Sequence, residues 1–106
     1  MNQLTVQALA LWLADPARSR PVLLDVREAW EVQTAALTDI THIPMREIPA
    51  RVAELDRKSE IVAICHQGGR SMQVAMFLER QGITMHNLAG GMDAWSREID
   101  PAVPRY

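Results

Sequence analysis

One cysteine stands in a setting that favours chemical reactivity. Cys65 ends a short aliphatic run, I-V-A-I, and the loop that follows it, H-Q-G-G-R-S, leads into a stretch with helical periodicity. Gly68 and Gly69 can adopt positive φ angles, which lets successive backbone N–H groups converge on one point. The first turn of a helix adds unpaired N–H groups, and Arg70 adds a positive charge. Such a setting stabilises a thiolate, the form in which cysteine is a nucleophile.

The same loop could hold a persulfide anion, or the oxyanion of a sulfur or phosphorus compound. His66 could carry a proton or bind an anionic donor, or it could simply face solvent, and Gln67 has the same two interpretations. Ser71 is expected to cap the following helix, and its hydroxyl could also reach the sulfur. A lone cysteine after an apolar run is more often a small core residue. Here the glycine-rich loop and the helix after it favour a functional thiol.

Short aliphatic runs alternate with helical periodicity along the chain, and this alternation predicts the elements that position Cys65. Strands are predicted over residues 22–26, 41–45, 61–65 and 83–88. Helices are predicted over residues 6–14, 28–33, 71–81 and 92–98, and another begins near Pro49. This order indicates an α/β fold, a parallel sheet of about five strands with helices on both faces. Ligands of such sheets bind at the carboxyl ends of the strands, where Cys65 lies.

Length and composition set the class of protein. The 106 residues suit one domain over 1–106, and two prolines predict an extended tail over 100–106. Apolar residues make up 48% and charged residues 23%, as in ordinary soluble proteins. A net charge of -2 without a basic cluster argues against a nucleic-acid partner, and no apolar run is long enough to cross a membrane.

Cysteine and histidine usage bears on location and on metals. One cysteine cannot form an internal disulfide, and the first residues lack a signal-peptide pattern, so a cytoplasmic location is expected. The single cysteine and three histidines have no metal-ligand spacing, so neither a metal nor another cofactor is expected.

The sequence resembles the rhodanese domain family over nearly its whole length. Four motifs carry the likeness: VLLDVRE at 22–28, HIPM at 42–45, CHQGGRS at 65–71 and NLAGGMDAW at 87–95. Four motifs in the right order and spacing are far more specific than any one of them. The resemblance implies a small α/β domain with a parallel sheet.

The resemblance also implies a sulfurtransferase that carries sulfane sulfur as a persulfide on Cys65. A small donor such as thiosulfate would load the sulfur, and a thiophilic acceptor, which could be cyanide, a thiol or a protein, would remove it. Backbone amides of residues 66–70 would stabilise the persulfide, and Arg70 would hold the anionic end of the donor.

Three residues outside the loop complete the site that the resemblance implies. Asp25 and Arg27 match a D-x-R pair that is expected to brace the site. Trp95 is expected to be a packing residue, and the resemblance adds that it could form one wall of the site. One segment departs from the family pattern. Related domains carry G-H-I-x-G-A before the I-P strand, and this chain has A-A-L-T-D-I at 35–40. The local turn there is therefore expected to differ.

Two other functions fit parts of the same pattern. Cysteine phosphatases and arsenate reductases also place a thiolate and an arginine around a tetrahedral oxyanion, with five residues between the two. This chain has four, from His66 to Gly69, and the smaller ring of amides suits a single sulfur better than a phosphoryl group. The second alternative is a non-catalytic rhodanese-like binding module. Such modules commonly lose the cysteine, which is present here.

Overall fold

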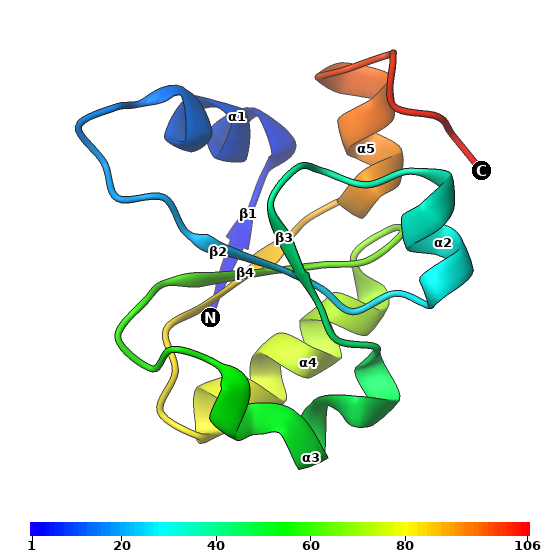
Figure 1. Ribbon diagram of the computed structural model, residues 1–106. Coiled ribbons are helices and arrows are strands. Elements are labelled where there is room, and N and C mark those ends of the chain that lie inside the picture. The colour runs from blue at the N-terminus through cyan, green and yellow to red at the C-terminus, as the bar shows by residue number, and fades with distance from the viewer.

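The protein is built around a five-stranded parallel sheet (Figure 1). The structure is a computed structural model that describes residues 1–106. The strands are Asn2–Leu4 (β1), Val22–Asp25 (β2), Ile40–His42 (β3), Ile61–Ile64 (β4) and Met85–Leu88 (β5). Their order across the sheet is β1-β5-β4-β2-β3, and every neighbouring pair is parallel. All five strands therefore end at the same edge of the sheet.

Helices cover both faces of this sheet, which confirms the predicted α/β class. The α-helices are Val6–Ala14 (α1), Ala29–Thr34 (α2), Ile48–Arg51 (α3), Gly69–Arg80 (α4) and Gly91–Glu98 (α5). Two short 3₁₀ turns, Met45–Glu47 (η1) and Val52–Glu54 (η2), flank α3. Figure 1 shows α1 and α5 on one side of the sheet and α3 and α4 on the other. None of the helices combines the length and apolarity that a membrane crossing requires.

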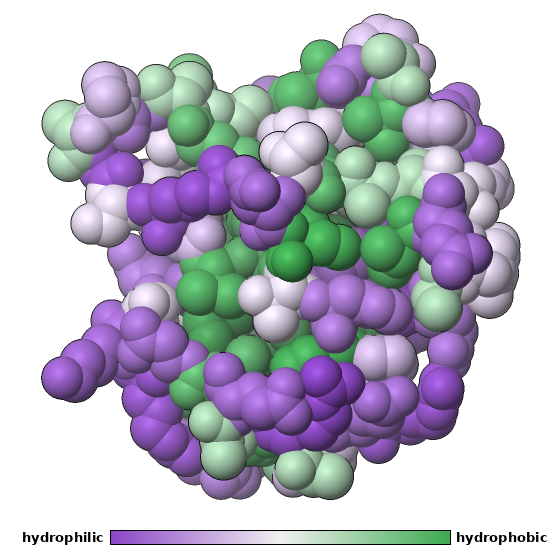
Figure 2. Space-filling model, in the orientation of Figure 1, coloured by the Kyte–Doolittle hydropathy of each residue, from purple (hydrophilic) through white to green (hydrophobic).

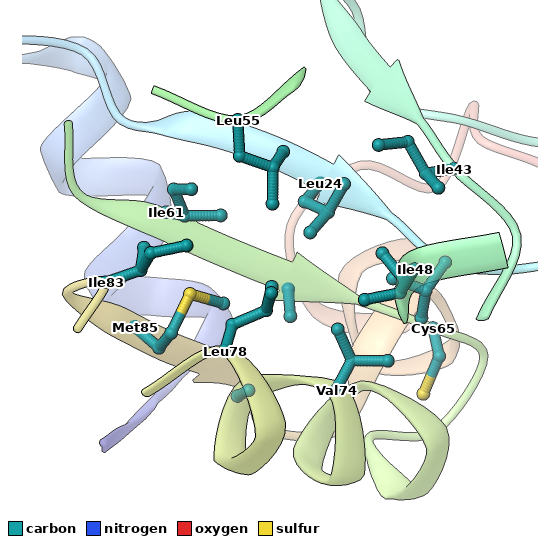
Figure 3. Packing of buried hydrophobic residues seen from close by; sticks show 13 residues of the cluster. Leu24, Ile43, Ile48, Leu55, Ile61, Cys65, Val74, Leu78, Ile83 and Met85 are labelled. Atoms are coloured by element: carbon teal, nitrogen blue, oxygen red, sulfur yellow. The ribbon is translucent and has the colours of Figure 1, made fainter. Parts of the chain in front are cut away.

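The core consists of two apolar clusters, one on each face of the sheet. Successive residues of the central strands point to opposite faces, so that Leu24 packs toward α4 and Leu23 toward α1. Figure 3 shows the α4 side, where Val74 and Leu78 of the helix meet the strands. This burial on both faces explains why β2 and β4 read as continuous apolar runs. Figure 2 shows hydrophilic side chains around much of the outer surface and apolar ones gathered near the middle of the view.

Most element bounds differ from the predictions by one to three residues, and one strand was not predicted. The edge strand β1 has no apolar alternation to reveal it, since its first two residues are exposed. The third strand ends at His42. Ile43 and Met45 still donate to the oxygens of Asp25 and Val26, but the chain then enters the 3₁₀ turn η1. Helix α4 begins at Gly69, two residues before Ser71.

The start of α5 packs directly against the backbone that carries Cys65. The N–H groups of Met92 and Asp93 donate to the carbonyl oxygens of Cys65 and His66, each over 2.9 Å. Gly91 makes this approach possible. It has φ +55°, and a Cβ there would lie 2.5 Å from the Cys65 oxygen and 2.6 Å from that of His66.

We predict that Gly91→Ala lowers the free energy of unfolding by about 2–4 kcal/mol, because it adds a steric clash to a positive φ. The control is Gly69→Ala, since a Cβ at Gly69 meets nothing within 4 Å. It should change stability by less than about 1 kcal/mol. Urea denaturation of the two variants measures the difference, and equal destabilisation would contradict the prediction.

Candidate active site

The candidate site lies where β2 and β4 end side by side. Asp25, the last residue of β2, is in register with Ile64, and Cys65 follows at once. The chain leaves β2 toward β3 on one side and leaves β4 toward β5 on the other. Such a switch point leaves a crevice between the two strand ends, the usual ligand position in an open α/β sheet.

The side chain of Cys65 is buried but has polar partners. Only 1% of the residue is exposed, and it belongs to the apolar cluster on the α4 side. Figure 3 shows it at the end of β4, with the sulfur directed toward the start of α4. Gly68 N donates to Sγ over 3.0 Å, and Ser71 Oγ lies 3.2 Å from it. Burial alone is typical of an inert core thiol. An inert thiol does not usually have two hydrogen-bond donors directed at its sulfur.

Glycine shapes the loop around this sulfur. Gly68 is the N-cap of α4 with φ +105°, a left-handed conformation that turns its N–H toward Sγ. The prediction that Ser71 caps the helix is therefore wrong. Ser71 is the third helical residue, and its side chain faces the sulfur instead. Gly69 and Gln67 are exposed.

The hydroxyl of Ser71 has a second partner, Asn87 of β5. Ser71 Oγ donates to Asn87 Oδ1 over 2.5 Å, and both side chains are buried. Asn87 Nδ2 donates to the oxygens of Gly68 and Gln3, over 3.1 and 2.9 Å. These two bonds fix the orientation of the amide, so its oxygen faces Ser71. The single proton of this hydroxyl is thus divided between an amide oxygen and the sulfur of Cys65.

Asp25 and Arg27 form a fully buried ion pair beside the loop. Arg27 Nη2 lies 2.6 Å from one Asp25 oxygen, and Nε lies 2.9 Å from the other. Neither side chain is exposed. The remaining Arg27 donors reach the backbone oxygens of Glu31 and Ala35 and the hydroxyl of Tyr106. The pair braces the end of β2 against the segment that follows α2.

Arg70 makes a second bidentate pair, with Glu31 of α2. Its two terminal nitrogens lie 2.7 and 2.8 Å from the carboxylate oxygens. These hydrogen bonds raise the pKa of Arg70, with a smaller contribution from the charge of Cys65. In return, Arg70 lowers the pKa of Glu31 from 4.5 to about 2, aided by hydrogen bonds from the backbone of Glu28 and from Tyr106. The guanidinium expected to meet a donor anion is already held by a carboxylate.

The tail returns to the site and is not simply extended. Pro101–Val103 form a turn, and Tyr106 then lies over the loop. Its ring centroid is 4.3 Å from that of His66, and its hydroxyl donates to Glu31 over 2.8 Å. Trp30, 60% exposed, meets the same ring edge-on at 5.7 Å. His66 is half-buried, and its Nδ1 has no hydrogen-bond partner.

Trp95 lies in the other core cluster, on the α1 side of the sheet. It is 8% exposed and packs with residues of α1 and α5. The structure thus places Cys65, Asp25, Arg27, Arg70 and Ser71 together, and it gives Trp95 a role in packing.

The family model for the rhodanese-like domain matches residues 7–98, most of the chain. The chain belongs to the rhodanese-like domain family. Among its relatives is the putative sulfurtransferase YtwF of Bacillus subtilis (strain 168), 43% identical over 79 residues, with 74% of this chain and 77% of the relative covered. A protein named sulfurtransferase from Allochromatium vinosum is 33% identical, over 97% of this chain and 95% of the relative.

Solved structures support the same assignment. The crystal structure of SSP1007 from Staphylococcus saprophyticus matches with a TM-score of 0.85 and 31% identity, and the match covers 93% of this chain and 97% of that one. The rhodanese-like domain also occurs within longer proteins. This chain spans 38% of the length of the chloroplastic rhodanese-like/PpiC domain-containing protein 12 of Arabidopsis thaliana, to which it is 33% identical.

Sequence reasoning missed three residues of this rhodanese-like site, namely Glu31, Asn87 and Tyr106. Glu31 had a local signal, because Glu28 and Glu31 have capping-box spacing and form such a box at the start of α2. Asn87 had a weaker one, as a polar residue inside a buried strand. Tyr106 had none, because its partners are distant in the sequence.

The low pKa of Glu31 predicts a pH-dependent contribution to the stability of the rhodanese-like domain. Because its pKa falls from 4.5 unfolded to about 2 folded, the contribution is complete at neutral pH and is lost as the pH drops from about 4.5 to about 2. At pH 7, the free energy of unfolding of Glu31→Gln should be about 2–3 kcal/mol lower than that of the unchanged protein. The gap should close toward pH 2.

Urea titrations at several pH values measure this gap. Glu54→Gln is the matched control, since it breaks an exposed Arg51–Glu54 pair. Its effect should be small at every pH. A gap for Glu31→Gln that stays constant down to pH 2 would contradict the assignment.

Proposed function

We propose that the protein is a sulfurtransferase that carries sulfane sulfur as a persulfide on Cys65. The observation that carries the proposal is the pair of donors at Sγ, Gly68 N at 3.0 Å and Ser71 Oγ at 3.2 Å. Relatives named sulfurtransferases, two of which match most of the chain, support the same class of activity. The proposal places the reaction at the ends of β2 and β4.

The loading step transfers one sulfur atom from a donor such as thiosulfate. The Cys65 thiolate attacks the outer sulfur of thiosulfate, a new S–S bond forms, and the old S–S bond breaks. Its electron pair leaves on sulfite. The persulfide then carries the negative charge on its terminal sulfur. We expect the backbone N–H groups of residues 66–70 to stabilise it, and that of Gly68 already reaches Sγ.

The unloading step returns the enzyme to its starting state. Cyanide, a small thiol or a protein thiol attacks the terminal sulfur, and the electron pair of the broken S–S bond returns to Cys65 as a thiolate. Cyanide becomes thiocyanate, and a thiol becomes a persulfide. Neither step needs an external oxidant or reductant. His66 follows the nucleophile in the sequence and is our candidate to relay a proton to or from the reacting sulfur.

The intact mass of the protein tests the proposal directly. After incubation with thiosulfate or with cysteine persulfide, the mass should rise by one sulfur atom and should return to its starting value on addition of cyanide. Cys65→Ser should show no gain with either donor. If the unchanged protein gains no sulfur from any sulfane donor, the proposed function is wrong.

Ser71→Ala tests the contribution of the hydroxyl. The rate of sulfur loading should fall about threefold to tenfold, because one hydrogen bond to the anionic sulfur is lost. The loss is modest since Asn87 already accepts the same proton. Ser96→Ala, which changes a buried serine of α5, is the matched control and should load at the normal rate. Equal loading rates in Ser71→Ala and Ser96→Ala would show that the Ser71 hydroxyl does not contribute to the reaction.

A further inference from the structure

Both arginines of the candidate site are paired with carboxylate side chains of the chain. Arg27 is paired with Asp25, and Arg70 with Glu31, in each case through two hydrogen bonds. Two positive and two negative charges leave these pairs with no net charge. A free dianion that approaches Cys65 therefore meets no unpaired guanidinium.

Glu31 is held so firmly that a passing anion cannot easily replace it. Its carboxylate accepts hydrogen bonds from both terminal nitrogens of Arg70, from the hydroxyl of Tyr106 and from the backbone N–H of Glu28. Its side chain is 5% exposed. Four donors from three segments of the chain hold one carboxylate in place, so Arg70 stays paired in the resting protein.

A hollow beside Arg70 offers room for an organic group. Its volume is about 340 Å³, and Val26, Met45 and Pro49 form apolar parts of its wall. The other arginine in the wall, Arg46, is itself paired with Glu28. The hollow thus combines apolar surface with cations that are already neutralised, which suits a carbon-bearing substituent better than a bare oxyanion.

We propose that Glu31 determines donor specificity, favouring organic persulfides, R–S–SH, over thiosulfate. The inference rests on the proposed function of Cys65 and concerns the choice between its donors. The Cys65 thiolate attacks the terminal sulfur of R–S–SH, the S–S bond of the donor breaks, and R–S⁻ leaves with the electron pair. The protonated donor carries no charge on the transferred sulfur, so the reaction needs no free cation. Thiosulfate must instead bring two negative charges beside Glu31.

The test compares loading rates of two donors in three proteins. Thiosulfate and freshly prepared cysteine persulfide are each mixed with the unchanged protein, Glu31→Gln and Glu54→Gln, and sulfur gain is followed by intact mass. Glu31→Gln should load from thiosulfate about tenfold faster, because it frees Arg70 and removes one repelling charge. Its rate with cysteine persulfide should change less than about twofold.

Glu54→Gln is the matched control. It removes the same charge and also breaks an arginine–glutamate pair, but on η2 and outside the network around Cys65. It should leave both rates unchanged. If Glu31→Gln changes both donors equally, or leaves or lowers the thiosulfate rate, the specificity proposal is wrong.

A measurement on the unchanged protein covers the case in which Glu31→Gln does not fold. With no net charge on the two pairs, added salt should not slow loading from thiosulfate. A steep fall in rate with ionic strength would reveal an available cation and overturn the proposal. The two hypotheses fail differently. If neither donor loads Cys65, the proposed function is wrong. If both donors load Cys65 but Glu31→Gln does not change the ratio of their loading rates, only the specificity proposal is wrong.

Discussion

A buried guanidinium organises the functional end of this protein. Arg27 has no exposed side-chain surface, yet all five of its N–H groups find acceptors, on Asp25, Glu31, Ala35 and Tyr106. Burying a charge is tolerable only when it is paired and fully hydrogen-bonded, and loss of one partner of such a pair typically costs about 3–5 kcal/mol. The acceptors come from the end of β2, from α2 and the segment after it, and from the tail. One side chain therefore fixes three segments that meet at the strand ends.

The same network of hydrogen bonds also holds the loop around Cys65 in place. Tyr106 accepts a hydrogen bond from Arg27 and donates one to Glu31, and Glu31 in turn holds Arg70 of the loop. The Asp25–Arg27 pair is thus connected to the Arg70–Glu31 pair through the hydroxyl of Tyr106. On the opposite side, the start of α5 binds the carbonyls of residues 65 and 66. The sulfur lies between two supports that belong to different parts of the chain.

Local pattern was enough to predict four of the five strands, most helices and the position of Cys65. A strand, a glycine-rich loop and a helix are consecutive in the sequence, so their chemistry can be read without knowledge of the fold. The partner of Arg70 lies 39 residues away, and Tyr106 lies 75 residues from Glu31. Pairs of that kind depend on which strand ends meet, and no local periodicity encodes them. Arg70 was for this reason expected to face a donor, although it faces Glu31.

Residues 35–40 lack the glycines and the histidine that related domains carry in this segment. The chain bends there, and Asp39 takes φ +56°. Aspartate tolerates this left-handed conformation better than most residues, because its short side chain can hydrogen-bond locally. Ala35 still supplies its carbonyl to Arg27. At this segment the buried pair thus depends on a backbone carbonyl and not on a side chain.

The hydroxyl of Ser71 carries one proton and stands between two acceptors. When the sulfur is protonated, the hydroxyl can keep donating its proton to Asn87 Oδ1, and an oxygen lone pair can face the S–H group. When the sulfur is anionic, rotation about a single C–O bond turns the proton toward it. The heavy atoms of the cradle need not move between these two states, so the reorganisation energy of each change in sulfur charge is confined to one hydrogen atom.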